Sequence, residues 1–329
     1  MSVSILSGLQ LDWPVDWSVL FERPAPLLLE IGFGRGDFLV ELAQKQPLAN
    51  VVGLEISLPS LRKGARKVSR RGLTNVAIVQ ADANYALHAL FRPASLSEVY
   101  INFPDPWPKP GHEHRRLINP YFLRLLASRM PAEARLNIAT DHPDYAAAIV
   151  TCLETTPYFV SRRGQTAVVA HGLLGTKYEQ KGLAEGRPGY YFYFERNQTP
   201  LAFPFPVLKE SAMPHVVLES PLTLAEIADQ FRPDSVTVGE TAVSLIELFH
   251  SAQQNKLLIE AYVKEAALSQ HIAAAIRCRQ NGQLVVELHD IGFPRPTVGT
   301  HHLIRFIVDW LSSLHADTTV VNSTLAGDM

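Results

Sequence analysis

Three acidic residues stand at the ends of three successive apolar runs: Glu30 in LLLEIG, Glu55 in VVGLE and Asp82 in VQADA. Carboxylates at strand ends can accept hydrogen bonds from ribose hydroxyls, and from the amino group of an adenine. An acid in such a place often only caps the next helix, so each one alone leaves both interpretations open. Three in succession favour a site for an adenosyl ligand.

A glycine-rich turn, with Gly32, Gly34 and Gly36, follows the first acid. Glycines let the backbone approach a ligand closely, and the helix N-terminus behind them favours partial negative charge. The spacing GFGRG lacks the two-residue gap of the dinucleotide fingerprint. Glu30, directly before it, would repel a pyrophosphate but attract a cation. S-adenosylmethionine, which carries a sulfonium and an ammonium group, fits this combination, and we expect it to be the cofactor.

A proline-rich stretch, NFPDPWPKPGHEHRRL, follows a later apolar run, with prolines at 104, 106, 108 and 110. Proline keeps the residue before it out of helical space, so we expect Asp105, Trp107 and Lys109 to be extended. A rigidly held acid is suited to orienting a reacting group. Trp107 is either a stacking face for a base or a packing residue.

Basic residues gather in two places. Arg115 and Arg116 close the proline-rich stretch, and LRKGARKVSRR, predicted to be a helix, places its bases in two adjacent rows at spacing i,i+4. This helix is either a solvated surface or a contact for an RNA backbone. For the second case we expect the phosphate contacts to come from Arg115, Arg116, Arg62, Lys63, Arg66 and Lys67.

The motifs EIGFGRG, GLEIS, ADA, NFPDPWPKPGHEHRRL, ATDHPDYA and TKYE occur in the order found in the bacterial tRNA (guanine-N7)-methyltransferase family. The chain resembles that family from about Leu27 to Arg196, and FPDPWPK followed by H..RRL is highly specific. The resemblance implies a Rossmann-type enzyme that uses S-adenosylmethionine to methylate N7 of the variable-loop guanine at tRNA position 46.

The resemblance also assigns roles to individual residues. Cofactor contacts fall on Glu30, Gly32, Gly34, Gly36, Glu55, Asp82, Ala83 and Asp105. Asp105 is in addition the catalytic candidate. Contacts with the substrate guanosine fall on Lys109, Asp141, Thr176, Lys177, Tyr178 and Glu179. Two positions depart from the family pattern: Gly111 stands where arginine is usual and His114 where lysine is usual.

Guanine N7 has a free lone pair, so its methylation needs no general base. We expect in-line placement to supply most of the rate enhancement, with Asp105 and Asp141 accepting hydrogen bonds from the N1 and N2 edge of guanine. N7 of a paired guanine lies in the deep, narrow groove of an RNA helix, so the target must be unpaired or extruded. Alternative functions are a small-molecule methyltransferase, which would not need the basic residues, and a noncatalytic RNA-binding relative.

The elements that would position these residues alternate between short apolar strands and helices as far as about Glu195. The pattern predicts a doubly wound α/β sheet, with ligands at the carboxyl ends of its strands. We predict a methyltransferase domain over 1–199, a linker over 200–206, a smaller α+β domain with an antiparallel sheet over 207–315, and a flexible tail over 316–329. Asn281-Gly282 predicts a hairpin turn in the second domain.

Composition excludes several classes of protein. Residues 1–199 hold 22 lysines and arginines against 18 acids, a balance of +4, whereas 200–329 hold 8 against 14, a balance of −6. An anionic partner such as tRNA therefore belongs to the first half. Cys152 and Cys278 form no zinc or disulfide pattern, and we expect no metal. We expect no leader, no membrane span and no basic N-terminal arm, and we expect a cytoplasmic monomer or homodimer.

Overall fold

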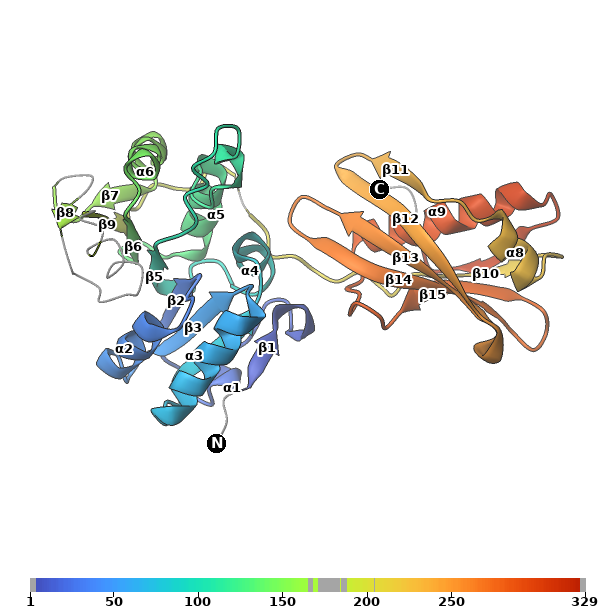
Figure 1. Ribbon diagram of the computed structural model, residues 1–329, viewed down its shortest axis with the longest axis horizontal. Coiled ribbons are helices and arrows are strands. Elements are labelled where there is room, and N and C mark those ends of the chain that lie inside the picture. The colour runs from blue at the N-terminus through green and yellow to red at the C-terminus, as the bar shows by residue number, and fades with distance from the viewer. Residues whose placement is uncertain (1–3, 165–167, 171–183, 185–187, 204, 326–329) are drawn as a thin grey trace. The chain divides into compact units, whose positions relative to one another are not determined.

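The computed structural model describes residues 4–164, 168–170, 184, 188–203 and 205–325. The chain divides into two compact units, Met1–Leu208 and Lys209–Met329 (Figure 1). Each unit has its own sheet. Within the described residues, no helix is both long and apolar enough to cross a bilayer.

The sheet of the first unit is built around apolar strands that match the runs in the sequence. Its strands are β1 (Ile5–Ser7), β2 (Leu27–Ile31), β3 (Asn50–Glu55), β4 (Val76–Gln80), β5 (Leu96–Asn102), β6 (Arg135–Thr140), β7 (Phe159–Ser161), β8 (Val168–Ala170) and β9 (Gly189–Arg196). All five residues of β2 are buried, as expected of a strand covered on both faces. The short β1, which the sequence pattern did not predict, pairs in parallel with β4 at one edge.

The strand order is β1-β4-β3-β2-β5-β6-β9-β7, with β8 paired to β9. Strands β4, β3, β2, β5 and β6 are parallel, and β9 is antiparallel to β6. The order runs outward from β2 to β4 and then starts again with β5 on the other side of β2. The switch point between β2 and β5 is where a doubly wound sheet binds its ligand. This topology confirms the predicted fold of the first domain.

The helices of the first unit are α1 (Trp17–Leu20), α2 (Asp37–Lys45), α3 (Leu58–Arg70), α4 (Ala83–Ala89), α5 (Pro120–Arg129) and α6 (Pro143–Thr155). Crossovers between parallel strands are right-handed, so the reversal of strand order places α2 and α3 on one face and α4, α5 and α6 on the other. The contacts agree, because α2 packs on α3, and α5 packs on both α4 and α6.

The end of the predicted linker, 200–206, packs against the first unit. Buried Arg129 donates from Nη1 to the carbonyl of Phe205 at 2.7 Å, and the backbone N–H of Leu208 donates to the carbonyl of His88 at 2.9 Å. The Phe205 ring contacts the rings of His88 and Tyr121. Burial, assisted by the charge of Arg129, lowers the pKa of His88 to about 4. The His88 ring that contacts Phe205 therefore stays uncharged near neutral pH.

The second unit contains an antiparallel sheet and helices, as predicted, and its described residues form seven strands and two α-helices. Its strands are β10 (His215–Glu219), β11 (Asp234–Val238), β12 (Thr241–Ser251), β13 (Lys256–Lys264), β14 (Ser269–Cys278), β15 (Leu284–His289) and β16 (Thr319–Ser323), in the order β11-β12-β13-β14-β15-β10-β16. Helices α8 (Leu224–Gln230) and α9 (Val298–Leu314) pack with one face of the sheet in a single apolar core. Helix α8 begins with a capping box formed by Thr223 and Glu226.

The prediction of a flexible tail over 316–329 is wrong for its central part. Residues Thr319–Ser323 form β16, which pairs antiparallel with β10. Thr324 holds the end of the strand, because its backbone N–H donates to the carbonyl of His215 at 3.0 Å. The strand was missed because it is short and its residues are mostly polar, with none of the alternation that marks a half-buried strand.

Candidate active site at the carboxyl edge of the first sheet

Five acids that the sequence singled out lie along one edge of the first sheet. Asp82, Glu55, Glu30, Asp105 and Asp141 are at or just beyond the carboxyl ends of β4, β3, β2, β5 and β6, which are neighbours in this order. Because these strands are parallel, their carboxyl ends meet at the same edge. The sheet therefore arranges the acids in a row, with Glu30 at the centre, beside the switch point.

Glu30 is the buried member of the row. Only 2% of its surface is exposed, and its Oε2 is buried without a hydrogen-bond partner. Its Oε1 has one long contact, 3.4 Å, from Nδ2 of Asn102 at the end of β5. Burial, followed by the nearby carboxylates of Glu55 and Asp37, raises the pKa of Glu30 to about 8. A carboxyl group held this way is suited to a cation that arrives from solution.

Glu55 ties the end of β3 to the glycine-rich turn. Its Oε2 accepts from the backbone N–H of Gly34 at 2.9 Å, and its Oε1 accepts from those of Ile56 and Ser57 at 2.8 and 3.0 Å. Gly32 and Gly34 have positive φ values of 71° and 53°, and a Cβ on either would meet nothing within 4 Å. The turn therefore presents bare backbone to open space.

Phe33, which the sequence analysis did not single out, anchors this turn. Its ring is buried between β3 and α3, where it replaces the side chains missing from Gly53 and Gly64. A Cβ on Gly64 would lie 2.6 Å from the Phe33 ring, and one on Gly53 would lie 2.7 Å from it. The signal in the sequence is a bulky residue inside a glycine motif, which needs small residues elsewhere to receive it.

Asp82 acts as the N-cap of α4, which is one of the two roles left open by the sequence. Its Oδ1 accepts from the backbone N–H groups of Asn84 and Tyr85 at 2.9 and 3.2 Å. Ala83, the first residue of α4, is buried. Asn84 is a further candidate that the sequence did not indicate, because its Oδ1 is buried without a partner.

These residues fit S-adenosylmethionine. The unpaired buried oxygen of Glu30 suits an ammonium group, since a buried polar atom without a partner is costly until a ligand satisfies it. The open space beside Gly32 and Gly34 admits a close approach to the backbone. Glu55 and Asp82 offer the remaining lone pairs of their carboxylates to hydroxyl and amino groups.

We predicted an extended conformation at Asp105, Trp107 and Lys109. This prediction is wrong at Trp107. Trp107 has a φ of 44°, in the left-handed region, so the chain turns there between Pro106 and Pro108. Arg116 donates from Nε to the carbonyl of Pro106 at 2.9 Å, and its guanidinium lies over the ring of buried Tyr145 at 5.2 Å. These contacts brace the stretch against α6. They stabilise the turn at Trp107, although a residue before proline normally prefers an extended conformation.

Arg115 and Arg116, both predicted as phosphate contacts, differ in their surroundings. Arg116 is half-buried, and its Nε and the face of its guanidinium are used within the protein. Arg115 is exposed and lies over the half-buried Trp107 ring at 5.0 Å. Trp107 therefore supports Arg115 as well as packing in the turn. Arg115 is the better placed of the two arginines to meet a phosphate.

Among the residues predicted to contact the guanine of the substrate, Asp105 and Lys109 are exposed and Asp141 is half-buried. No hydrogen bond from a described residue reaches the carboxylate of Asp105, which faces solvent between two prolines. Thr176, Lys177, Tyr178 and Glu179 lie outside the described residues, so their predicted contacts with substrate are not placed.

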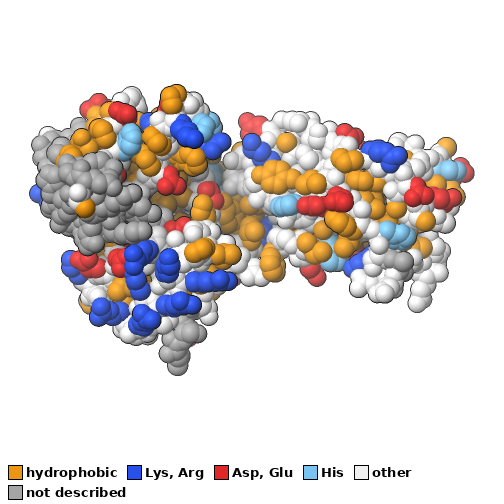
Figure 2. All heavy atoms as spheres, in the orientation of Figure 1, with side chains coloured by type: hydrophobic (Ala, Val, Ile, Leu, Met, Phe, Trp, Pro, Cys, Tyr) orange, Lys and Arg blue, Asp and Glu red, His pale blue; other side chains and the backbone are white. Residues whose placement is uncertain are grey.

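Helix α3 carries the predicted basic surface. Arg62, Lys63 and Arg66 are exposed, as are Arg70 and Arg71 at its end. Figure 2 shows Lys and Arg side chains gathered over the part of the first unit where α3 lies in Figure 1. Lys67 differs, because it forms an ion pair with Asp37 of α2. The sequence could not reveal this ion pair, because Asp37 lies in a different helix.

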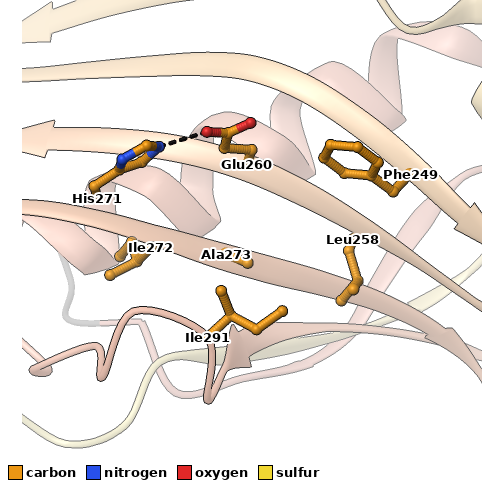
Figure 3. A pocket seen from close by; sticks show the side chains of 7 residues that line it. All are labelled: Phe249, Leu258, Glu260, His271, Ile272, Ala273 and Ile291. Atoms are coloured by element: carbon orange, nitrogen blue, oxygen red, sulfur yellow. Dashed lines mark hydrogen bonds and ion pairs between the residues drawn. The ribbon is translucent and has the colours of Figure 1, made fainter.

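Outside this edge, the second unit has a pocket of about 230 Å³ on the sheet face opposite α8 and α9 (Figure 3). Phe249, Leu258, Ala273 and Ile291 form its apolar part, and Oε1 of Glu260 lies 2.5 Å from Nε2 of His271. Serine, cysteine and lysine are missing from the described residues that line this pocket. Across the described residues, no three histidine, cysteine or acidic side chains are grouped to hold a metal.

Comparison with known proteins gave consistent matches. A family model described as a putative methyltransferase matches residues 24–192. The tRNA (guanine-N(7)-)-methyltransferase of Thermus thermophilus is 31% identical over 306 residues, which cover 92% of this chain and 94% of that protein. That length exceeds the first unit, so the similarity extends into the second.

The enzyme of the same name from Thermotoga maritima is 39% identical over 175 residues, which cover 53% of this chain and 55% of that protein. The match thus spans about half the length of each. Among solved structures, TrmN from Thermus thermophilus matches with a TM-score of 0.39 and 20% identity, over 54% of this chain and 46% of that one.

Proposed function

Because the chain belongs to the tRNA (guanine-N7)-methyltransferase family, we propose that it methylates N7 of the variable-loop guanine at position 46 of tRNA. Its methyl donor is S-adenosylmethionine. The observation that carries the proposal is the row of acids at the carboxyl edge of β4, β3, β2, β5 and β6, with the buried, unpaired oxygen of Glu30 at its centre.

The cofactor half of the row is Glu30, Glu55 and Asp82. When bound, S-adenosylmethionine supplies an electrophilic methyl group on its sulfonium. Glu30 would hold the ammonium group, Glu55 the ribose hydroxyls, and Asp82 with Asn84 the adenine edge. Gly32 and Gly34 leave room for this ligand, and the buried Phe33 ring keeps their turn in place.

The acceptor half of the row is Asp105 and Asp141, with Lys109 beside them. Guanine N7 brings its own lone pair, so the protein has no proton to remove before methyl transfer. Asp105 and Asp141 would accept hydrogen bonds from N1–H and the N2 amino group, which orients the base and increases the electron density at N7. Proline on both sides of Asp105, and the brace of Arg116 on the carbonyl of Pro106, limit the motion of this acceptor.

Methylation of defined transcripts tests the proposed function. The protein is incubated with labelled S-adenosylmethionine and either an unmodified tRNA transcript that has G46 or a matched transcript with A46. We expect nearly one methyl group per G46 transcript, with borohydride and aniline cleavage at position 46, and almost none on the A46 transcript. Equal incorporation into both would refute the position, and transfer only to small metabolites would support the alternative enzyme.

Replacing Arg62, Lys63 and Arg66 together by glutamine is expected to weaken tRNA binding. Removing one side chain that neutralises a phosphate lowers the slope of log K against log salt by about one unit. We therefore expect the slope to fall by about two to three units, and KM for tRNA to rise with little change in kcat. Filter binding at several salt concentrations and steady-state kinetics measure the two effects.

The control for this variant removes the same number of charges from the second unit, where Lys209, Arg232 and Lys264 are exposed. Replacing these three by glutamine should leave the slope unchanged. An equal fall in both variants would mean that net charge, and not the surface of α3, governs binding.

A further inference from the structure

The N-terminal segment, residues 8–15, begins at the carboxyl edge of the first sheet. Strand β1 runs parallel to β4, and the last residues of the two strands are paired, so both strands end at the same edge. Gly8 lies against Ala81, because a Cβ on Gly8 would be 2.9 Å from the Cβ of Ala81. Asp82, the outermost acid of the row, directly follows Ala81. The start of the segment is therefore close to the acid that is expected to bind adenine.

Tyr85 joins this segment to Asp82. Its side chain is buried, and its hydroxyl donates to the carbonyl of Gly8 at 2.8 Å and accepts from Nε1–H of Trp13 at 2.9 Å. The Trp13 ring lies edge-on to the Tyr85 ring, with 5.9 Å between the centroids. The backbone N–H of Tyr85 donates to Oδ1 of Asp82 at 3.2 Å. One residue thus contacts both the N-terminal segment and the acid.

Helix α4 depends on contacts of this kind. It has seven residues, and a helix this short is marginal in water without tertiary packing. Asp82 is exposed, and its Oδ1 accepts from the backbone N–H groups of Asn84 and Tyr85, so its orientation depends on the first turn of α4. The segment holds the other end of α4 as well, because the backbone N–H of Val15 donates to the carbonyl of Leu90 at 3.1 Å.

We propose that Tyr85 is a positioning residue for the cofactor, which acts by fixing the carboxylate of Asp82 against the adenine amino group. The inference rests on the adenine contact assigned to Asp82 in the proposed function. Tyr85 can fix the acid because Gly8 and Trp13 hold its hydroxyl from outside the helix. Both of these residues precede residues 24–192, which the family model matches. The adenine selectivity of the protein therefore depends on a segment outside that match.

Selectivity for adenine reports the position of Asp82. The adenine amino group donates to a carboxylate, whereas hypoxanthine carries at the same place a carbonyl oxygen that can only accept. A site built to hydrogen-bond an N–H group discriminates strongly against an analogue that lacks it. Movement of the carboxylate reduces this discrimination, while a general weakening of the site lowers the affinity for both ligands equally.

Calorimetry with the full chain tests the proposal, using S-adenosylhomocysteine and S-inosylhomocysteine as ligands. We expect the wild type to prefer the adenosyl ligand, and Tyr85→Phe to reduce the ratio of the two dissociation constants about tenfold, the effect of losing one hydrogen bond to a charged group. An unchanged ratio in Tyr85→Phe, or equal affinities in the wild type, would overturn the role of Tyr85 and leave the cofactor site standing. A wild type that binds neither ligand would refute the cofactor site itself, and with it this inference.

Tyr121→Phe is the matched control. The Tyr121 hydroxyl lies 2.8 Å from Nε2 of His88, so this variant also removes a phenolic hydroxyl that contacts α4, but at the end far from Asp82. It should leave the ratio at the wild-type value. An equal reduction in both variants would mean that any loosening of α4 alters the ratio, and would overturn the specific role of Tyr85.

Gly8→Ala tests the segment without altering Tyr85. The new Cβ would lie 2.9 Å from the Cβ of Ala81 and 3.1 Å from the carbonyl oxygen of Gln80, so the segment must shift away from the end of β4. We expect the ratio to fall in this variant too. A wild-type ratio would exclude the segment from the positioning of Asp82. Thermal melting confirms that each variant is folded.

Discussion

Glu30→Gln is expected to lower the affinity for S-adenosylmethionine at least 100-fold and, at the same time, to make the ligand-free protein more stable at neutral pH. The loss of affinity follows from removing one partner of a buried ion pair, which typically costs about 2–5 kcal/mol. The gain in stability follows from the burial of Glu30, whose pKa is raised to about 8. Calorimetry of cofactor binding and thermal melting of the free protein measure the two effects.

The gain in stability depends on pH in a defined direction. Between the ordinary carboxyl pKa of 4.5 and the folded value of about 8, the folded chain binds a proton that the unfolded chain does not. Stability therefore falls as pH rises through this window, and the stabilising contribution is lost above it. Glutamine has no such dependence, so the variant should match the wild type near pH 4.5 and exceed it by about 3 kcal/mol at pH 7.

Cofactor binding to the wild type should release a proton below pH 8, because the ammonium group favours the ionised form of Glu30. Calorimetry in buffers of different ionisation enthalpy detects that release, which should vanish above pH 9. The control is Glu41→Gln, since Glu41 is an exposed carboxylate of α2 paired with Lys45. It should change neither affinity nor proton release. A Glu30→Gln variant with normal affinity would remove Glu30 from the cofactor site.

Asp105→Asn is the second large effect that we expect. Asparagine keeps one oxygen acceptor but replaces the other with an N–H donor, which would face the donors on the guanine edge. A hydrogen bond to a charged group is worth about 1.5–3 kcal/mol, so kcat on tRNA should fall about 10- to 100-fold. Affinity for the cofactor should change much less. Single-turnover methylation and cofactor titration separate the two parameters.

The control for Asp105 is Glu113→Gln, which removes an exposed carboxylate from the same stretch. It should leave kcat on tRNA within about twofold, because an exposed carboxylate that contacts neither cofactor nor guanine contributes little to the stabilisation of the transition state. Near-normal turnover of Asp105→Asn would exclude the orienting role. A large loss of cofactor affinity with unchanged kcat would assign Asp105 to the cofactor instead.

Most elements of both units follow from local sequence. Helix Pro120–Arg129 begins at an asparagine cap with proline behind it, and strand His215–Glu219 is an apolar run with two valines, so both follow from a few neighbouring residues. The two misses have different causes. The three residues of β1 make too short a run to show a period, and Trp107 adopts a positive φ because Arg116 and Tyr145 hold the stretch around it.

The placement of acids at strand ends could be predicted from the amino-acid pattern alone, since alternating strands and helices bring such residues to one edge of a parallel sheet. These acids are Glu30, Glu55, Asp82, Asp105 and Asp141. Their surroundings depend on the folded protein. Glu30 is desolvated beside Asn102, Asp82 caps α4, Arg116 braces the proline-rich stretch, and Lys67 is neutralised by Asp37. Periodicity is a local property of the chain, whereas burial and pairing depend on residues that the fold brings together from distant segments.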